Sequence, residues 1–161
     1  MTPEQRELIA LLGRTREHLL TMRGLLSEES GSLQARNIGK IESLAAEKRN
    51  LAEELNLLAE KQRDLLAGLG HSADRAGVEA CIEQIVTEGG DATLAEFWKE
   101  LIELTAECKY QNEINGTYVG LLERYVEATL DLISGSPSQS ETYSCKGSRT
   151  RATLSRRSFT V

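Results

Sequence analysis

The sequence is poor in aromatic residues and proline, and it contains no long apolar run. Phe, Trp and Tyr together make up 4% of the 161 residues, and only two residues are proline. So few aromatic side chains disfavour a compact globule around a large pocket, whereas abundant Leu and Ala with scarce proline favour helices. No apolar stretch approaches the roughly 18 residues of a membrane-spanning helix. We therefore expect no membrane insertion.

Cysteine is also sparse, and the cysteines form no metal or redox motif. Cys81, Cys108 and Cys145 are an odd number at wide spacings, without a Cys-x-x-Cys pair. The first residues, MTPEQRELIA, carry an acidic residue where a signal peptide needs positive charge. These features predict a soluble protein of the reducing cytoplasm. Cys108 falls among apolar positions of a helical pattern, and we interpret it as a small core residue.

Motifs for catalysis and metal binding are missing as well. The two histidines, His18 and His71, do not belong to the Glu-x-x-His pairs that a metal site in a helical bundle needs. We assign both to surface or packing roles. The sequence has no glycine-rich phosphate loop followed by Lys-Ser/Thr and no Gly-x-Ser-x-Gly element. We expect no enzyme, no cofactor and no metal.

Charge divides the chain into two regions. The 19 Lys and Arg residues split into 14 in residues 1–134 and five in residues 135–161, and the 25 Asp and Glu residues split into 24 and one. The last 27 residues are therefore basic, and 11 of them are Ser or Thr. Such a segment buries too little apolar surface to offset its ordering entropy. We predict a helical domain over residues 1–134 and a flexible, basic, Ser/Thr-rich tail over residues 135–161.

Helix signals divide the acidic region into three long segments and one short segment. A capping pattern of Thr2, Pro3 and Gln5 begins the first helix, which we expect to end in a turn over residues 27–32. Mainly apolar residues in steps of three and four, with Lys48 and Gln62 at two of the positions, predict a second helix over residues 41–65. Gly68, Gly70 and Gly77 then break the chain before a short helix over residues 78–87.

The last long helix is predicted from residue 94 to residue 132. Thr93 and Glu96 form a second capping pattern before it, and Gly135 ends it. The predicted fold is all-α, an elongated antiparallel helical bundle with coiled-coil-like packing. It has three long helices, one short helix and a flexible C-terminal tail.

The stretch YQNEINGTYVG, residues 110–120, places residues that disfavour helices inside this last helix. Gln111 and Asn115 fall on the seam of the helix, where polar residues lower stability but fix register and orientation. Gly116 and Gly120, one turn apart, would allow another backbone to approach closely or would let the helix flex. The charged residues around them exclude a membrane helix pair.

Apolar residues after this stretch cover an arc wider than one helix seam requires. We predict that part of this surface lacks a partner within the molecule and binds an amphipathic helix of another protein. The alternatives are that the bundle itself covers the surface or that a second copy of the chain does. The candidate residues for client binding are Tyr118, Val119, Leu122, Tyr125, Val126, Leu130 and Ile133.

Three stretches make the sequence similar to the FlgN family of bacterial flagellar export chaperones. They are RNIGKIESLAAEKRNLAEEL, CKYQNEINGTYVGLLERYVEATLDLI and ETYSCKGSRT. The second is the most specific, because FlgN-like sequences carry an Asn-x-x-Asn-Gly element in their last long helix, matched by Asn112, Asn115 and Gly116. Tyr143 and Gly147 match a Tyr followed by Gly in the tail, although Ser-Cys-Lys between them departs from the family pattern.

The resemblance implies a cytosolic chaperone of type III flagellar export. Such a chaperone binds unpolymerised hook-filament junction (hook-associated) proteins by their C-terminal helices and brings them to the export apparatus for flagellum assembly. It also implies that the C-terminal region binds the client and that Tyr143 docks to a component of the export gate. No cofactor is implied.

Two other functions fit the residues. A structural coiled-coil protein would cover its apolar surface by self-association, in the simplest case as a homodimer. A nucleic-acid-associated protein would use Arg149, Arg151, Arg156 and Arg157 to release counterions from phosphates. We expect no nucleic-acid binding, because the acidic body would repel the phosphate backbone.

Overall fold

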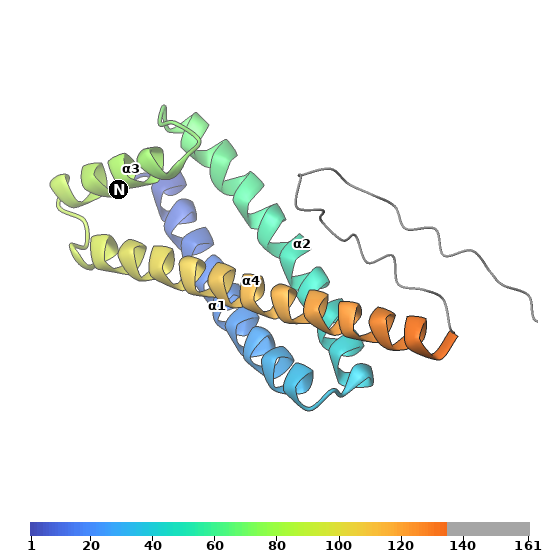
Figure 1. Ribbon diagram of the computed structural model, residues 1–161. Coiled ribbons are helices and arrows are strands. Elements are labelled where there is room, and N and C mark those ends of the chain that lie inside the picture. Colours follow the sequence, from blue (N-terminus) through green and yellow to red (C-terminus); the bar gives the residue numbers. More distant parts are fainter. Residues whose placement is uncertain (135–161) are drawn as a thin grey trace, which may run out of the picture. The chain divides into compact units, whose positions relative to one another are not determined.

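Four helices make up the described part of the chain, which covers residues 1–134 in a computed structural model (Figure 1). They are α1 (Pro3–Gln34), α2 (Ile38–Gly68), α3 (Arg75–Thr87) and α4 (Thr93–Ser134). Residues 1–134 contain no strand. The predicted all-α class, with three long helices and one short one, is confirmed. The predicted tail and Tyr143 lie outside the described residues.

The start of α1 is the predicted capping box. The Gln5 backbone N–H donates to Thr2 Oγ1 at 3.2 Å, and the Thr2 backbone N–H donates to Gln5 Oε1 at 2.7 Å. This reciprocal pair satisfies two amide groups that the first helical turn leaves without partners. Pro3 follows at the first helical position, where its missing N–H costs nothing.

The predicted turn over residues 27–32 is wrong, because α1 continues through it to Gln34. Leu26, Glu29 and Leu33 are buried at helical spacing, so packing holds this stretch in the helix despite its Ser and Gly content. The Ser32 hydroxyl donates to the Glu28 carbonyl at 2.8 Å and is satisfied without leaving the helix. The reversal into α2 comes only after α1, where Arg36 adopts a φ of 53°.

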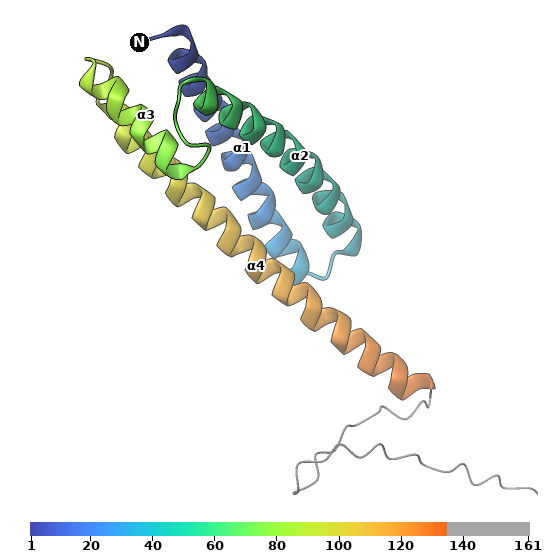
Figure 2. The same cartoon turned by 90° about the horizontal axis from the view of Figure 1, so that it is seen from above.

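α1 and α2 form an antiparallel hairpin, and the first part of α4 runs beside α1 (Figure 2). Arg16 pairs with Glu100, and Arg23 pairs with Glu107, in each case 84 residues later in the sequence. The constant separation means that α1 and α4 run in the same direction. The core between the helices consists mainly of Leu8, Leu12, Leu19, Leu26, Leu66, Val78, Cys81, Ile82, Ile85, Leu94, Leu101, Leu104 and Cys108.

Cys108 has the core position predicted from the sequence. It is buried, and its Sγ donates to the Leu19 carbonyl at 3.5 Å. Burial is the largest cause that raises the pKa of the Cys108 thiol, and burial likewise raises the pKa of Cys81. Both side chains therefore stay protonated at neutral pH and act as small apolar residues.

The short helix α3 begins three residues earlier than predicted, and Gly77 lies inside it rather than before it. Asp74 caps the helix by accepting the Gly77 N–H at 2.9 Å, and it also accepts the Ser72 hydroxyl at 2.7 Å. The hydrogen bond from Ser72, followed by that from Gly77, lowers the pKa of the Asp74 carboxyl. A Cβ atom at Gly77 would clash with the Ser72 carbonyl oxygen. Glycine is therefore required where the loop passes over the helix.

Substituting Gly77→Ala is expected to reduce the free energy of unfolding by about 1–3 kcal/mol, the usual cost of inserting a methyl group into a filled space. Gly24→Ala is the matched control, because Gly24 lies inside α1 with no atom within 4 Å of an added Cβ. The control is expected to raise stability by up to about 1 kcal/mol through helix propensity. Urea unfolding followed by circular dichroism measures both. Equal effects of the two substitutions would contradict the role assigned to Gly77.

α4 begins at Thr93, so Thr93 is not the cap that the sequence predicts. Asp91 accepts the Thr93 N–H at 2.9 Å instead. This backbone hydrogen bond is the main cause that lowers the pKa of Asp91. The apolar stripe of α4 is buried as predicted at Leu94, Leu101, Leu104 and Cys108.

Residues Met1–Tyr118 form one compact unit, and the second unit begins at Val119. The first unit contains α1, α2, α3 and the larger part of α4. Of the second unit, the structure describes residues 119–134, which are all helical. In these residues every side chain is exposed or half-buried.

Candidate functional site

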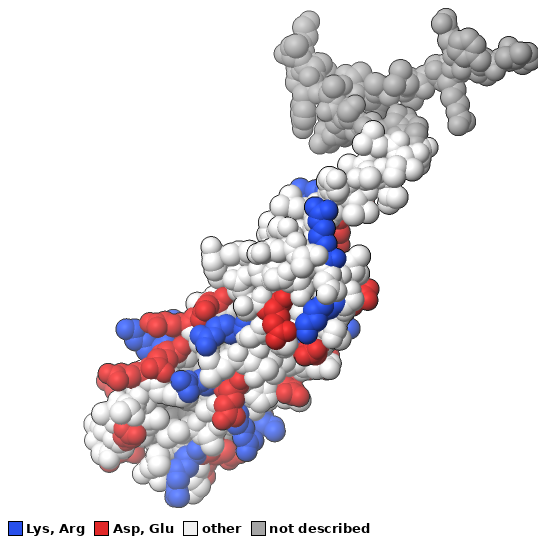
Figure 3. All heavy atoms as spheres, turned by 90° about the horizontal axis from the view of Figure 1, so that it is seen from below, with Lys and Arg blue, Asp and Glu red and all other residues white. Residues whose placement is uncertain are grey.

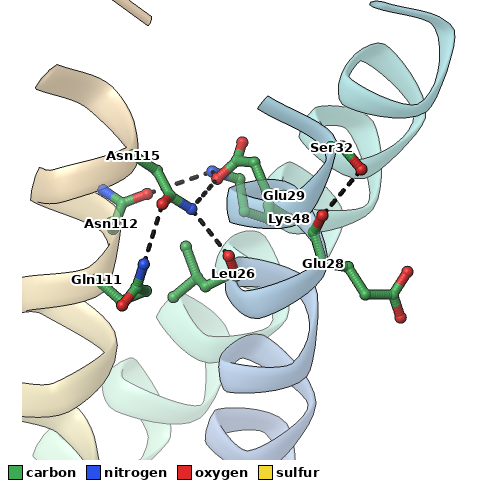
Figure 4. A network of polar contacts seen from close by, with 8 residues as sticks. All are labelled: Leu26, Glu28, Glu29, Ser32, Lys48, Gln111, Asn112 and Asn115. Atoms are coloured by element: carbon green, nitrogen blue, oxygen red, sulfur yellow. Dashed lines mark hydrogen bonds and ion pairs between the residues drawn. The ribbon is translucent and has the colours of Figure 1, made fainter. Parts of the chain in front are cut away.

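A cluster of polar side chains joins α1, α2 and α4 within the first unit (Figure 4). We call Glu29, Lys48, Gln111, Asn112 and Asn115 the polar cluster. Asn115 Nδ2 donates to the Leu26 carbonyl at 2.9 Å and to Glu29 Oε2 at 2.8 Å. The Asn115 side chain, 2% exposed, thereby attaches α4 to both the backbone and a side chain of α1.

Lys48 brings α2 into the same cluster. Its Nζ donates to Glu29 Oε2 at 2.8 Å and to Asn112 Oδ1 at 3.3 Å. Gln111 Nε2 completes the cluster by donating to Asn115 Oδ1 at 3.1 Å. A single carboxylate oxygen of Glu29 thus receives one donor from α2 and one from α4.

The cluster satisfies its members at low exposure. The side chains of Glu29 and Lys48 are 7% and 18% exposed, and no buried side-chain polar atom in residues 1–134 lacks a hydrogen-bond partner. A buried charge pair does not by itself make a protein more stable, but shifting α4 along α1 would leave its members unpaired. The cluster therefore sets the register of α4 against the hairpin.

Sequence reasoning placed Asn115 and Gln111 on the seam, and the structure shows Asn115 buried and Gln111 half-buried. It did not find Glu29, because the predicted turn removed that residue from the first helix. Lys48, at a core position of the predicted second helix, was the only sign that a buried carboxylate partner was needed.

Gly116 and Gly120 do not serve close helix packing within the described residues. No atom there lies within 4 Å of a Cβ built on either glycine. The interpretation of this pair as a point of close backbone approach is therefore not supported inside residues 1–134. Gly116 follows Asn115 directly and completes the Asn-x-x-Asn-Gly element.

The end of α4 carries an apolar row, which we call the C-terminal apolar face. Its members are Val119, Leu122, Val126, Leu130 and Ile133, in steps of three and four residues. At 3.6 residues per turn they fall within an arc of about 80°. Val126, Leu130 and Ile133 are 53%, 58% and 78% exposed, and Val119 and Leu122 are half-buried. Exposed side chains of this size in a row are unusual on a soluble helix.

The two candidate tyrosines of α4 are also exposed. Tyr118 is the last residue of the first unit, and Tyr125 lies beside the C-terminal apolar face in the second. Within α4, the exposed large apolar residues that the candidate set did not include are Tyr110, Ile114, Leu121 and Leu132. Tyr110, Ile114 and Tyr118 follow one another at four-residue steps, a signal present in the sequence but concealed by the polar residues between them.

The charged residues of the second unit lie outside the arc of the C-terminal apolar face. Among residues 119–134 only Glu123, Arg124, Glu127 and Asp131 are charged. Figure 3 shows, on the face drawn, red and blue side chains scattered over the body and mostly uncharged surface on the described residues next to the grey ones. An uncharged apolar helix surface suits contact with apolar side chains of another protein.

Neither a metal site nor a membrane-spanning helix is found in residues 1–134. No group of three or more His, Cys, Asp or Glu side chains there is arranged to hold an ion. None of these helices combines the length and the apolar character needed to cross a bilayer. His18 lies between α1 and α2, with Nε2 2.9 Å from Glu54 Oε2.

The described residues define an all-α helical protein. Its longest helix joins a polar cluster with α1 and α2 and, further along, carries an exposed apolar face. The sequence model of the FlgN protein family matches residues 1–151. The chain belongs to the FlgN family, whose members are flagellar export chaperones that bind flagellar proteins. Comparisons with curated proteins and with solved structures find no match.

Proposed function

We propose that this chain is a cytoplasmic chaperone of the unpolymerised hook-associated proteins and binds their C-terminal helices through the C-terminal apolar face. The exposure of Val126, Leu130 and Ile133 is the observation that carries the proposal. Family membership supports a client among flagellar proteins. The helical spacing of the face supports an amphipathic helix as the bound element.

Binding to such a face requires neither ATP nor a chemical step. A client helix that lies on it removes apolar surface of both partners from water, a gain of about 1.5–3 kcal/mol for each fully buried Val, Leu or Ile side chain. Ordering of the client helix and the loss of free motion oppose this gain, so the net affinity stays moderate. Moderate affinity allows the chaperone to shield a polymerising helix and then release it for export.

For delivery, the proposal assigns a separate role to residues 135–161. Tyr143 and Gly147 match the family pattern in this basic segment, which supports Tyr143 as a contact to the export gate. In this scheme the helical domain over residues 1–134 binds the client and the tail binds the export apparatus. The two roles are then separable by truncation.

The test is a calorimetric titration of the full chain with a hook-associated protein, either intact or lacking its C-terminal helical segment. We expect saturable binding of the intact client and none of the shortened client. A version of the chaperone ending at Ser134 should bind the client with unchanged affinity but fail to bind the export gate component. Equal binding of both clients would refute the proposed client segment.

Self-association is the second candidate function, since the same exposed residues favour it. Two copies packed through the C-terminal apolar face would protect it from water without any client. Sedimentation equilibrium of the chain alone decides between the two. A tight dimer that neither dissociates on dilution nor yields to the client would favour the structural coiled coil.

A further inference from the structure

A groove runs between α3 and α4 in the first unit, and its lining residues belong neither to the polar cluster nor to the C-terminal apolar face. Its volume is about 620 Å³. Ile82 and Val86 line it from α3, and Ala95, Trp98 and Ile102 line it from α4. Val86, Trp98 and Ile102 are only half-buried, so the core of the unit does not use their surface fully.

The groove continues along α4 into a second depression of about 410 Å³. The two share Arg75, Trp98 and Ile102, and the second extends along α4 to Ala106 and Lys109. Beyond Arg75 its other side is formed by Thr15 of α1 and Gln62 of α2 in place of α3. We call the two depressions together the strip. From Ala95 to Lys109 the strip measures about 21 Å at 1.5 Å per residue. This length matches about four turns of helix and exceeds what a compact small ligand fills.

Charged side chains along the rim of the strip form ion pairs in its middle and are unpaired at its two ends. Arg75 Nε lies 2.7 Å from Glu79 Oε1, and Lys99 Nζ lies 4.0 Å from Glu103 Oε1. Glu79 Oε1 also accepts the Trp98 indole N–H at 3.4 Å, which satisfies the polar edge of that ring.

At the ends, Glu83 lines the first depression and Lys109 lines the second. Both are exposed, and neither forms a side-chain ion pair within residues 1–134. The strip therefore presents one free carboxylate and one free ammonium group, separated by an apolar floor.

We infer that the strip is a docking site for a second protein helix, distinct from the C-terminal apolar face. Its occupant is an amphipathic helix of about four turns from a protein partner. The helix places apolar side chains at i, i+3 or i+4, and i+7 on the floor formed by Val86, Trp98 and Ile102. It carries a Lys or Arg near the end that meets Glu83 and an Asp or Glu near the end that meets Lys109.

Two observations favour a protein helix as the occupant. Two helix walls receive a third helix at the usual interaxial distance of 8–10 Å, and burial against both walls exceeds burial against one exposed helix face. Opposite charges at the two ends select partners with complementary ends, since like charges across an interface are disfavoured. The inference does not depend on the identity of the client.

The test uses two 16-residue capped helical peptides that contain no Trp and share the same Leu spacing. The mixed peptide has Lys at one end and Glu at the other, and the acidic peptide has Glu at both ends. Trp98 is the only tryptophan of the chain, so its emission reports binding directly. We expect saturable binding by the full chain with at least fivefold preference for the mixed peptide.

Variants of the protein make the test specific. Glu83→Lys is expected to reverse the preference towards the acidic peptide, whereas the same charge change in the exposed Glu42→Lys of α2 should leave it unaltered. Ile102→Asp should abolish binding of both peptides, and Val126→Asp should leave it intact. Because Glu83 is exposed, its substitution keeps the test valid even if Ile102→Asp disturbs folding.

Three outcomes would overturn the inference. The first is that neither peptide produces a saturable change in Trp98 emission. The second is that Glu83→Lys keeps the same peptide preference as the original chain. The third is that Trp98 emission changes when the chain alone is diluted. The last outcome would mean that a second copy occupies the strip. Loss of client binding in Val126→Asp with intact peptide binding would separate this site from the C-terminal apolar face.

Discussion

Replacing Lys48 by methionine is expected to lower the free energy of unfolding by about 2–3 kcal/mol. The substitution removes the ammonium group that pairs with Glu29 at 2.8 Å and leaves a nearly buried carboxylate with only the Asn115 amide as partner. Removing one member of a fully buried pair costs about 3–5 kcal/mol. The 18% exposure of the Lys48 side chain places the expected value below that range. Urea unfolding at pH 7, followed by circular dichroism, measures it.

A second substitution, at Glu29, tests whether the unpaired carboxylate causes the loss of stability in Lys48→Met. In the double variant Glu29→Leu/Lys48→Met no buried charge remains, and replacing a whole pair by apolar residues is often neutral. We expect the double variant to be more stable than Lys48→Met alone. Arg23→Met is the matched control, because the ion pair of Arg23 with Glu107 is exposed and worth less than about 1 kcal/mol. A cost for Lys48→Met no larger than this control would show that the polar cluster does not hold α4.

Substituting Val126→Asp is expected to weaken binding of the hook-associated client by at least about 100-fold, and this is the largest functional effect that we predict. Val126 is the third of the five residues of the C-terminal apolar face, and a client helix on that face would bury the new carboxylate without a partner. Burying an unpaired charge costs several kcal/mol, and about 2.7 kcal/mol corresponds to 100-fold in affinity. Titration calorimetry against the intact client gives the affinity.

The helical unit should survive the substitution, because Val126 is 53% exposed and belongs to the second unit. Circular dichroism and the unfolding midpoint are therefore expected to stay close to those of the original chain. Ala128→Asp introduces the same charge two residues later, on the side of the helix about 160° away. The control should bind the client normally. If Val126→Asp also binds it normally, the C-terminal apolar face is not the client site.

Much of the fold follows from local sequence signals, and the main error shows where such signals fail. The capping box at Thr2 and the break after Gly68 depend on neighbouring residues alone and are found where predicted. Residues 27–32 contain Ser, Glu and Gly, which favour a turn, yet Leu26 and Leu33, two turns apart on the same face, are buried and keep the helix intact. The burial comes from α2 and α4, which local propensity does not include.

The candidate site was predictable to the extent that it lies along one helix. Spacing alone identified the C-terminal apolar face, because all its members belong to α4. The polar cluster needs α1, α2 and α4 in a particular register, so Asn115 was recognised as a seam residue but its acceptor Glu29 was not. The groove between α3 and α4 depends on how two helices pack, and nothing near Trp98 in the sequence indicates a partner surface.

The rates at which the buried thiols of Cys81 and Cys108 react with a chemical probe can report motion within the first unit. Cys108 donates its S–H to a carbonyl of α1, so a thiol-reactive probe reaches it only when α4 separates from α1. Because burial keeps both thiols protonated, labelling in the closed state is slow. The labelling rate of Cys108 thus reports how often that pair of helices opens, without any engineered reporter.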